Sequence, residues 1–95
     1  MIDLEFHNIK IERFKNTNRL ILKGEVTNGN ISYYSTVAVR VILFIKNIPA
    51  VNEVFVINDL AKGSTKAFER NIYDLKPKEE LDDITRYEIF TDSCY

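Results

Sequence analysis

The residues of this chain that could do chemistry are few. His7 is the single histidine, and Cys94 is the single cysteine, next to the C-terminus. A general base needs an acid and a nucleophile within reach, and neither residue has a recognisable catalytic partner nearby in the sequence. Metal and triad sites also combine several such groups. We therefore predict no enzymatic activity, no metal and no other cofactor, with His7 facing solvent on a strand and Cys94 as a partly exposed thiol.

The densest acidic cluster is Glu79–Glu80 followed by Asp82–Asp83. Calcium takes several oxygen ligands from one tight loop, and this spacing fits no EF-hand. Lys76 and Lys78 lie close enough in the sequence to compensate the charge, which is typical of a solvated turn. We predict a charged turn here, with a weak cation site as the alternative.

Tyr33 and Tyr34 follow the turn signal Asn28–Gly29–Asn30 in a polar loop. Two tyrosines at one end of a fold can stack on a sugar or anchor a protein partner. The alternative is that one ring folds back over the edge of the core, since aromatic rings gain most from burial. These two residues are candidate loop binding residues, and they make a carbohydrate-binding module our alternative function.

The elements that must position these residues are β-strands, of which residues 36–46 form the central one. This segment is β-branched, aliphatic and aromatic, with one interior charge, Arg40. Alternation and turn residues predict strands over 4–15, 19–27, 36–46, 51–58, 65–72 and 85–91. We expect a bend near Asn8, a break at Asn47–Ile48–Pro49, and a short helical turn near 77–82 that Pro77 begins.

Six or seven short strands in 95 residues predict a single all-β domain over 1–95, an antiparallel sandwich. The loop after residue 28 is too long for a two-residue hairpin, so the strands on either side of it are expected in different sheets. Gly24, inside the second strand, predicts a bulge or the close approach of a neighbouring strand or ring.

The central strand has two faces. One row is apolar throughout and is predicted to lie in the core: Val37, Val39, Val41, Leu43 and Ile45. The other row, Ala38 to Lys46, should be polar in a two-layer sandwich, yet it contains Ile42 and Phe44. Ile21 and Phe90 could extend these two into an apolar patch.

Apolar patches often mark interfaces, so Arg40, Ile42 and Phe44 are candidate binding residues on the sheet face. The alternative is that residues 74–83 or the first strand cover them. If the face binds a partner, Phe44→Asp is expected to abolish binding or change the oligomeric state while the fold stays intact.

Charge and hydropathy exclude several partners. The net charge is −1, from 13 basic and 14 acidic residues, which disfavours nucleic acid. No run is long and apolar enough for a spanning helix, so no membrane insertion is expected. Met1–Glu5 shows no signal peptide, which predicts a cytoplasmic protein as given, or an extracytoplasmic one if this is a domain of a longer protein.

Three blocks of sequence carry a resemblance. Leu22–Asn28 contains Gly–x–Val–x–Asn, and Leu60–Phe68 contains Leu–x–x–Gly before a strand with Phe. With Val41–Ile45 between them, they resemble the bacterial FxLYD-type domain, an immunoglobulin-like sandwich. The chain departs at the naming motif, where Val41, Phe44 and Ile45 replace Phe, Tyr and Asp. The resemblance implies a sandwich without cofactor or chemistry, in a family that is often extracytoplasmic and of unknown function.

Together these observations predict a non-enzymatic binding or structural module of unknown biological role. It would act through its apolar sheet face, with a second copy of itself, as a homodimer, or another protein as the partner.

Overall fold

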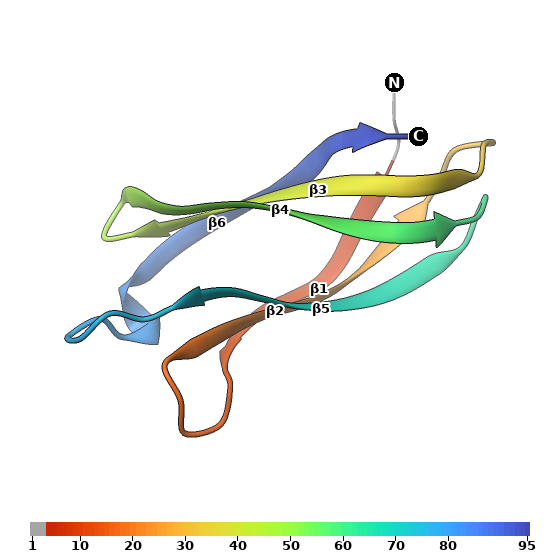
Figure 1. Ribbon diagram of the computed structural model, residues 1–95. Coiled ribbons are helices and arrows are strands. Elements are labelled where there is room, and N and C mark those ends of the chain that lie inside the picture. Colours follow the sequence, from red (N-terminus) through yellow and green to blue (C-terminus); the bar gives the residue numbers. More distant parts are fainter. Residues whose placement is uncertain (1–3) are drawn as a thin grey trace.

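The computed structural model describes residues 4–95 as six antiparallel strands in two packed three-stranded sheets (Figure 1). The elements are β1 (Leu4–Arg13), β2 (Arg19–Asn28), β3 (Tyr34–Ile45), β4 (Ile48–Leu60), β5 (Thr65–Asp74), the 3-10 turn η1 (Leu81–Asp83) and β6 (Ile84–Cys94). One sheet has the order β1-β2-β5 and the other β4-β3-β6. The predicted all-β sandwich with a short helical turn is confirmed, but the turn begins at Leu81 and not at Pro77. The prediction for Met1–Glu5 falls partly on residues 1–3, which lie outside the described residues.

The core lies between the two sheets and contains the predicted inner row of the central strand. Val37, Val39, Val41 and Leu43 are fully buried, and Ile45 is 8% exposed. The β1-β2-β5 sheet contributes the buried side chains of Leu20, Leu22, Val26, Phe68 and Ile72. Alternate residues of a strand point to opposite faces, so this row also determines which residues of β3 face outward.

The predicted bend in β1 is a bulge at Asn8, whose φ is 53°. The register with β2 shifts between His7 and Lys10. Across from the bulge, Gly24 permits a close approach, as its position predicted. A Cβ there would lie 2.4 Å from Ile9 Cδ1 and 2.8 Å from Phe68 Cζ, so a larger residue would have to displace one of them.

The long connection from β2 to β3 crosses between the two sheets, as its length predicted. It is tied to the β4–β5 turn by the fully buried side chain of Asn28. Asn28 Nδ2 donates to the carbonyls of Ser32 at 2.8 Å and Leu60 at 3.1 Å. Its backbone N–H donates to Ser64 O at 3.0 Å, and its carbonyl accepts from Gly63 N at 2.8 Å. We call these four hydrogen bonds the Asn28 latch.

The connection from β3 to β4 differs from the prediction. Lys46 and Asn47 both have positive φ, 51° and 66°, and Ile45 pairs with Ile48 across them. This is the geometry of a two-residue hairpin turn that matches the twist of the strands. The break therefore falls one residue earlier than expected, and β4 begins at Ile48 and includes Pro49. Because β4 is an edge strand, a residue without an N–H is tolerated there.

Candidate functional site

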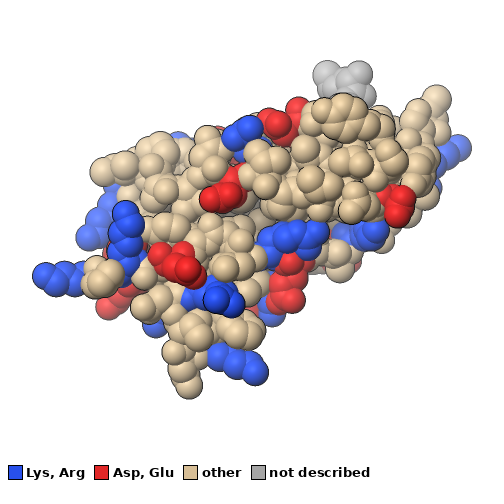
Figure 2. Space-filling view, in the orientation of Figure 1, with Lys and Arg blue, Asp and Glu red and all other residues tan. Residues whose placement is uncertain are grey.

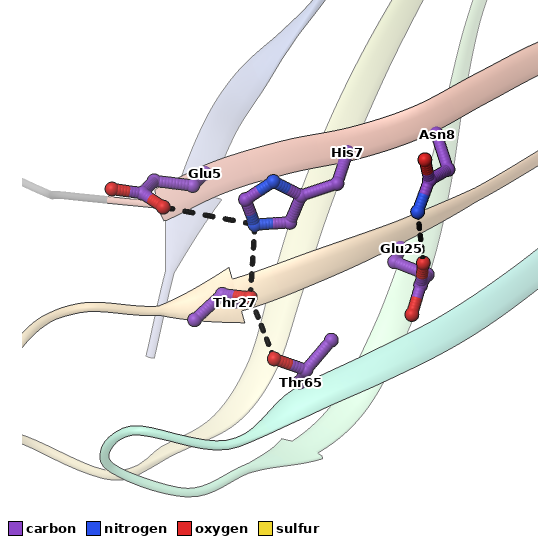
Figure 3. Close-up of polar contacts among 6 residues, drawn as sticks. All are labelled: Glu5, His7, Asn8, Glu25, Thr27 and Thr65. Carbon is purple, nitrogen blue, oxygen red and sulfur yellow. Dashed lines mark hydrogen bonds and ion pairs between the residues drawn. The ribbon is translucent and has the colours of Figure 1, made fainter.

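Polar side chains from three strands meet on the outer face of the β1-β2-β5 sheet (Figure 3). His7 Nε2 lies 3.0 Å from Thr27 Oγ1, which in turn lies 2.7 Å from Thr65 Oγ1. Glu5 Oε2 is 3.6 Å from the same ring nitrogen of His7. Glu5, Thr27 and Thr65 occupy one cross-strand row, because Thr27 pairs with Glu5 on one side and with Thr65 on the other.

An acid, a histidine and a hydroxyl have the composition of a nucleophilic triad, but the connectivity here is different. In a triad the acid binds one ring nitrogen and the nucleophile binds the other. Both Glu5 and Thr27 contact Nε2 of His7, so the acid does not orient the ring toward the hydroxyl. The His7 side chain is also 40% exposed. The arrangement is a surface hydrogen-bond chain on a solvated face, where the sequence placed His7.

A shallow hollow of about 610 Å³ lies on the same face, and sequence reasoning missed it. It forms where the short residues Gly24 and Ala67 sit among long charged ones. Lys23 Nζ at its wall is 3.1 Å from Glu12 Oε2 and 3.6 Å from Glu69 Oε1. The hydrogen bond to Glu12 raises the pKa of Lys23. Lys23 therefore already has two carboxylate partners within the chain and does not need a charged ligand.

The outer face of the β4-β3-β6 sheet is apolar. Val54 and Val56 on β4 are 43% and 42% exposed, and Phe90 on β6 is 41% exposed. Ala38 and Ile42 are partly exposed on β3. Ala38 lies opposite Val56, Ile42 lies opposite Asn52 and Glu88, and Arg40 between them lies opposite Val54 and Phe90. We call Ala38, Ile42, Val54, Val56 and Phe90 the apolar face. In Figure 2 a broad area without charged residues covers β3 and β4, and positive side chains follow the seam between β4 and β5.

Ile21, which we expected beside Ile42 and Phe44, lies instead on β2 in the other sheet. The period of a strand shows which residues share its face but not which strands become its neighbours. Phe90, the other expected neighbour, does lie beside β3, where it pairs with Arg40.

Arg40 lies in the middle of the apolar face with its charge compensated. Its Nε donates to Asp92 Oδ1 at 3.0 Å, and its Nη1 donates to Asn52 Oδ1 at 2.6 Å. The side chains of Arg40 and Asp92 are 30% and 38% exposed, so water screens the pair in part. A partner on this face would therefore not need to supply a counter-charge for Arg40.

Phe44 is 7% exposed, which makes it part of the buried structure and not an exposed anchor. The guanidinium of Arg86 on β6 lies 3.7 Å from the centre of its ring, a cation–π contact. We had expected any cover to come from residues 74–83 or the first strand, but this cover comes from the last strand. Phe44 and Arg86 lie directly opposite each other, at the last pair of the regular β3–β6 register. The variant Phe44→Asp would consequently test folding and not binding.

The acidic segment between β5 and β6 has local partners. Glu79 Oε1 accepts from the backbone N–H of Lys76 at 2.7 Å and from the hydroxyl of Tyr73 at 2.8 Å. These bonds, the first above all, lower the pKa of Glu79. Asp83 Oδ2 accepts from the backbone N–H of Glu80 at 3.0 Å. In the part of the chain that the structure describes, no three His, Cys, Asp or Glu side chains gather as a metal site.

The two tyrosines of the β2–β3 loop have different environments. Tyr33 is 55% exposed, and its hydroxyl donates to Asp59, which raises the pKa of Tyr33. Tyr34 begins β3 and packs against the core, as the alternative of a ring folded over the core edge predicted. A sugar platform made from both rings would need both to be exposed, and one of them is partly buried.

Cys94 lies near the end of β6 opposite Val37 and packs against the core. Burial raises the pKa of Cys94, and a thiol with a raised pKa is a weak nucleophile at neutral pH. The thiol is therefore a packing group in this fold.

No family model, curated protein or solved structure matches this chain. The part of the FxLYD resemblance that the structure supports is the two-sheet sandwich. Over residues 4–95, no helix combines the length and the hydropathy needed to cross a membrane.

Proposed function

We propose that this protein is a non-enzymatic binding module that uses its apolar face to hold a protein partner. The observation that supports the proposal is the exposure of Val54, Val56 and Phe90 together on one sheet. A sandwich sheet normally turns polar residues outward, and a clustered exception is typical of an interaction site. No catalytic role is proposed for His7 or Cys94, since neither has the partners that a general base or a nucleophile needs.

The chemistry of the face defines the kind of partner. The two cations on this side are each matched by an anion: Arg40 by Asp92 at 3.0 Å, and Arg86 by Glu88 at 2.8 Å. The face thus offers apolar area around one compensated ion pair, Arg40–Asp92, with a second pair, Arg86–Glu88, toward Phe44. The partner that fits it is an apolar, uncharged segment of another protein, because unmatched charges would lose solvation there without a counter-ion.

We also propose a distant immunoglobulin-like relationship for the chain. Support comes from the Asn28 latch, which joins Asn28 of one resembling block to Leu60 and Gly63 of the other. The two blocks therefore meet at one structural corner, which supports the proposed relationship.

Selection from a random-peptide display library tests the proposed function. The bait is the folded chain, and the comparison bait is the double variant Val54→Lys/Val56→Lys. Both valines are more than two-fifths exposed, so the variant should keep the fold. We expect the selected peptides to be rich in apolar residues, and the double variant to weaken their binding about tenfold or more, as for a central interface site.

The matched control is Glu69→Lys, which adds a lysine to the outer face of the other sheet. It should leave peptide binding unchanged. Peptides that bind the double variant as well as the original chain, or that lose binding to the Glu69→Lys control instead, would contradict the proposed function. So would the absence of any enriched peptide.

A further inference from the structure

The four edge strands of the sandwich are not equally protected. A free edge presents unpaired backbone groups to any other strand, and proteins usually obstruct such edges. The edge of β4 is obstructed by cations from β5: Arg70 Nη2 donates to Val56 O at 2.9 Å, and Lys66 Nζ donates to Asn58 O. These contacts join the two edge strands that lie side by side in Figure 1, so β4 and β5 shield each other.

The two remaining edges are β1 and β6. The bulge at Asn8, with its positive φ, interrupts the edge of β1 in the middle. The register of β6 shifts only toward its ends, which leaves Arg86–Thr91 regular along β3. Among residues 4–95, this stretch pairs with β3 on one side and with no strand on the other. It contains neither proline nor glycine.

We propose that β6 pairs with β6 of a second copy of this chain, antiparallel, about a two-fold axis at Ile89. An antiparallel pair of identical strands needs an axis perpendicular to the sheet, so opposed residues must lie on the same face. The inference concerns the strand edge and goes beyond the proposed binding through the apolar face.

Charge selects this position of the axis among the neighbouring ones. An axis at Glu88 would set two carboxylates directly opposite each other, which is destabilising. An axis at Tyr87 would centre the pairing close to the register shift at Phe44. With the axis at Ile89, Glu88 of each copy faces Phe90 of the other and no like charges are opposed. Arg86 of each copy then faces Asp92 of the other, an opposite charge at the register shift just beyond the regular stretch.

The same axis also places apolar groups well. Phe90 of one copy becomes the diagonal neighbour of Phe90 of the other, within reach of aromatic side chains. Phe90 is 41% exposed in the single chain, and the pairing would cover the part of it that faces the strand edge. On the inner face, Tyr87 of one copy faces Thr91 of the other.

Disulfide trapping tests both the pairing and the axis. In a Cys94→Ser background, one chain carries Tyr87→Cys and a second carries Thr91→Cys. We expect a disulfide-linked dimer when the two are mixed under mild oxidation, and little when each is oxidised separately. Ile89→Cys in the same background should link to itself. Sedimentation of the unmodified chain should give the mass of two chains.

The control is Lys23→Cys in the same background, on the outer face of the other sheet. A dimer that traps equally through position 23 would overturn the proposal, as would a mass of one chain at every concentration tested. Self-linkage of Tyr87→Cys would overturn the axis at Ile89. If Ile89→Cys fails to fold, the mixture of the Tyr87→Cys and Thr91→Cys chains still tests the proposed pairing. The Val54→Lys/Val56→Lys variant should keep the edge dimer, so failure of the apolar face and failure of the edge can be told apart.

Discussion

The two outer faces of this sandwich share an architecture and differ in chemistry. On the β1-β2-β5 sheet, charged and hydroxyl side chains alternate across the strands, as in the row of Glu5, Thr27 and Thr65. On the β4-β3-β6 sheet, the row through Val54 and Phe90 has apolar ends with Arg40 between them, and Val56 lies exposed in the next row. Both sheets bury an apolar inner face. The difference between the outer faces is therefore the observation on which the proposed binding rests.

The cationic side chains of the two outer faces also differ in how they contact their partners. The cations of the polar face extend into solvent and meet anions across the strands, as Lys23 meets Glu12 and Glu69. On the other face, the side chains of Arg40 and Arg86 pack along the surface of the sheet. Arg40 binds Asp92 and Asn52, and Arg86 covers the ring of Phe44. An arginine can do this because its stem packs on apolar surface while its head keeps polar partners.

The largest expected effect is a difference in the free energy of unfolding between variants of two phenylalanines in the same sheet. Phe44→Ala should lower the free energy of unfolding by about 3–5 kcal/mol, because Phe44 is 7% exposed and also loses its contact with Arg86. Phe90→Ala should cost about 1 kcal/mol or less, since 41% of Phe90 is already in water. Urea denaturation of both variants measures the difference. Equal costs would mean that the face is not divided into a covered and an exposed part.

The next effect concerns the sheet with the polar outer face. Gly24→Ala should destabilise the protein by about 1–3 kcal/mol, because the new methyl group would meet Ile9 Cδ1 and the Phe68 ring. Ile9→Val removes the nearer of these atoms, so the double variant should recover part of the loss. A double-mutant cycle from urea denaturation gives the coupling. Additive costs would show that Ile9 does not occupy this space.

The smallest effect is expected on the polar face itself. Thr27→Val removes the hydroxyl that links His7 to Thr65, and water can reach both partners at this half-buried position on the outer face. The free energy of unfolding should therefore fall by no more than about 1 kcal/mol. Thr65→Val is the matched variant and should behave alike. A loss of several kcal/mol would make this chain of hydrogen bonds a structural element, and the contrast between the two faces would weaken.

The strands and the inner faces were predictable because both depend on local pattern. The alternation from Val37 to Ile45 places one row in the core whatever the neighbouring strands are. The length of the loop after Asn28 was enough to place β2 and β3 in different sheets. The close approach at Gly24 was predictable because a glycine inside a strand leaves room for a neighbouring group. The bend at Asn8 was predictable because asparagine tolerates a positive φ better than most residues.

The remaining features depend on contacts between strands that are far apart in the sequence. Arg86 covers Phe44 across 42 positions, because β6 pairs with β3 in a register that no period reveals. The contact of His7 with Thr27 likewise needs the register of β1 on β2. Pro49 was misleading for a related reason: proline is excluded from a central strand but not from an edge, and the sequence does not say which strands form the edges.

The Asn28 latch has a consequence for how the molecule opens. Its hydrogen bonds reach the β2–β3 connection through Ser32 and the β4–β5 turn through Leu60 and Ser64. If either connection detaches, the buried Asn28 loses hydrogen-bond partners. We therefore expect the two loops at this end to open together, although 32 positions separate Asn28 from Leu60 in the sequence.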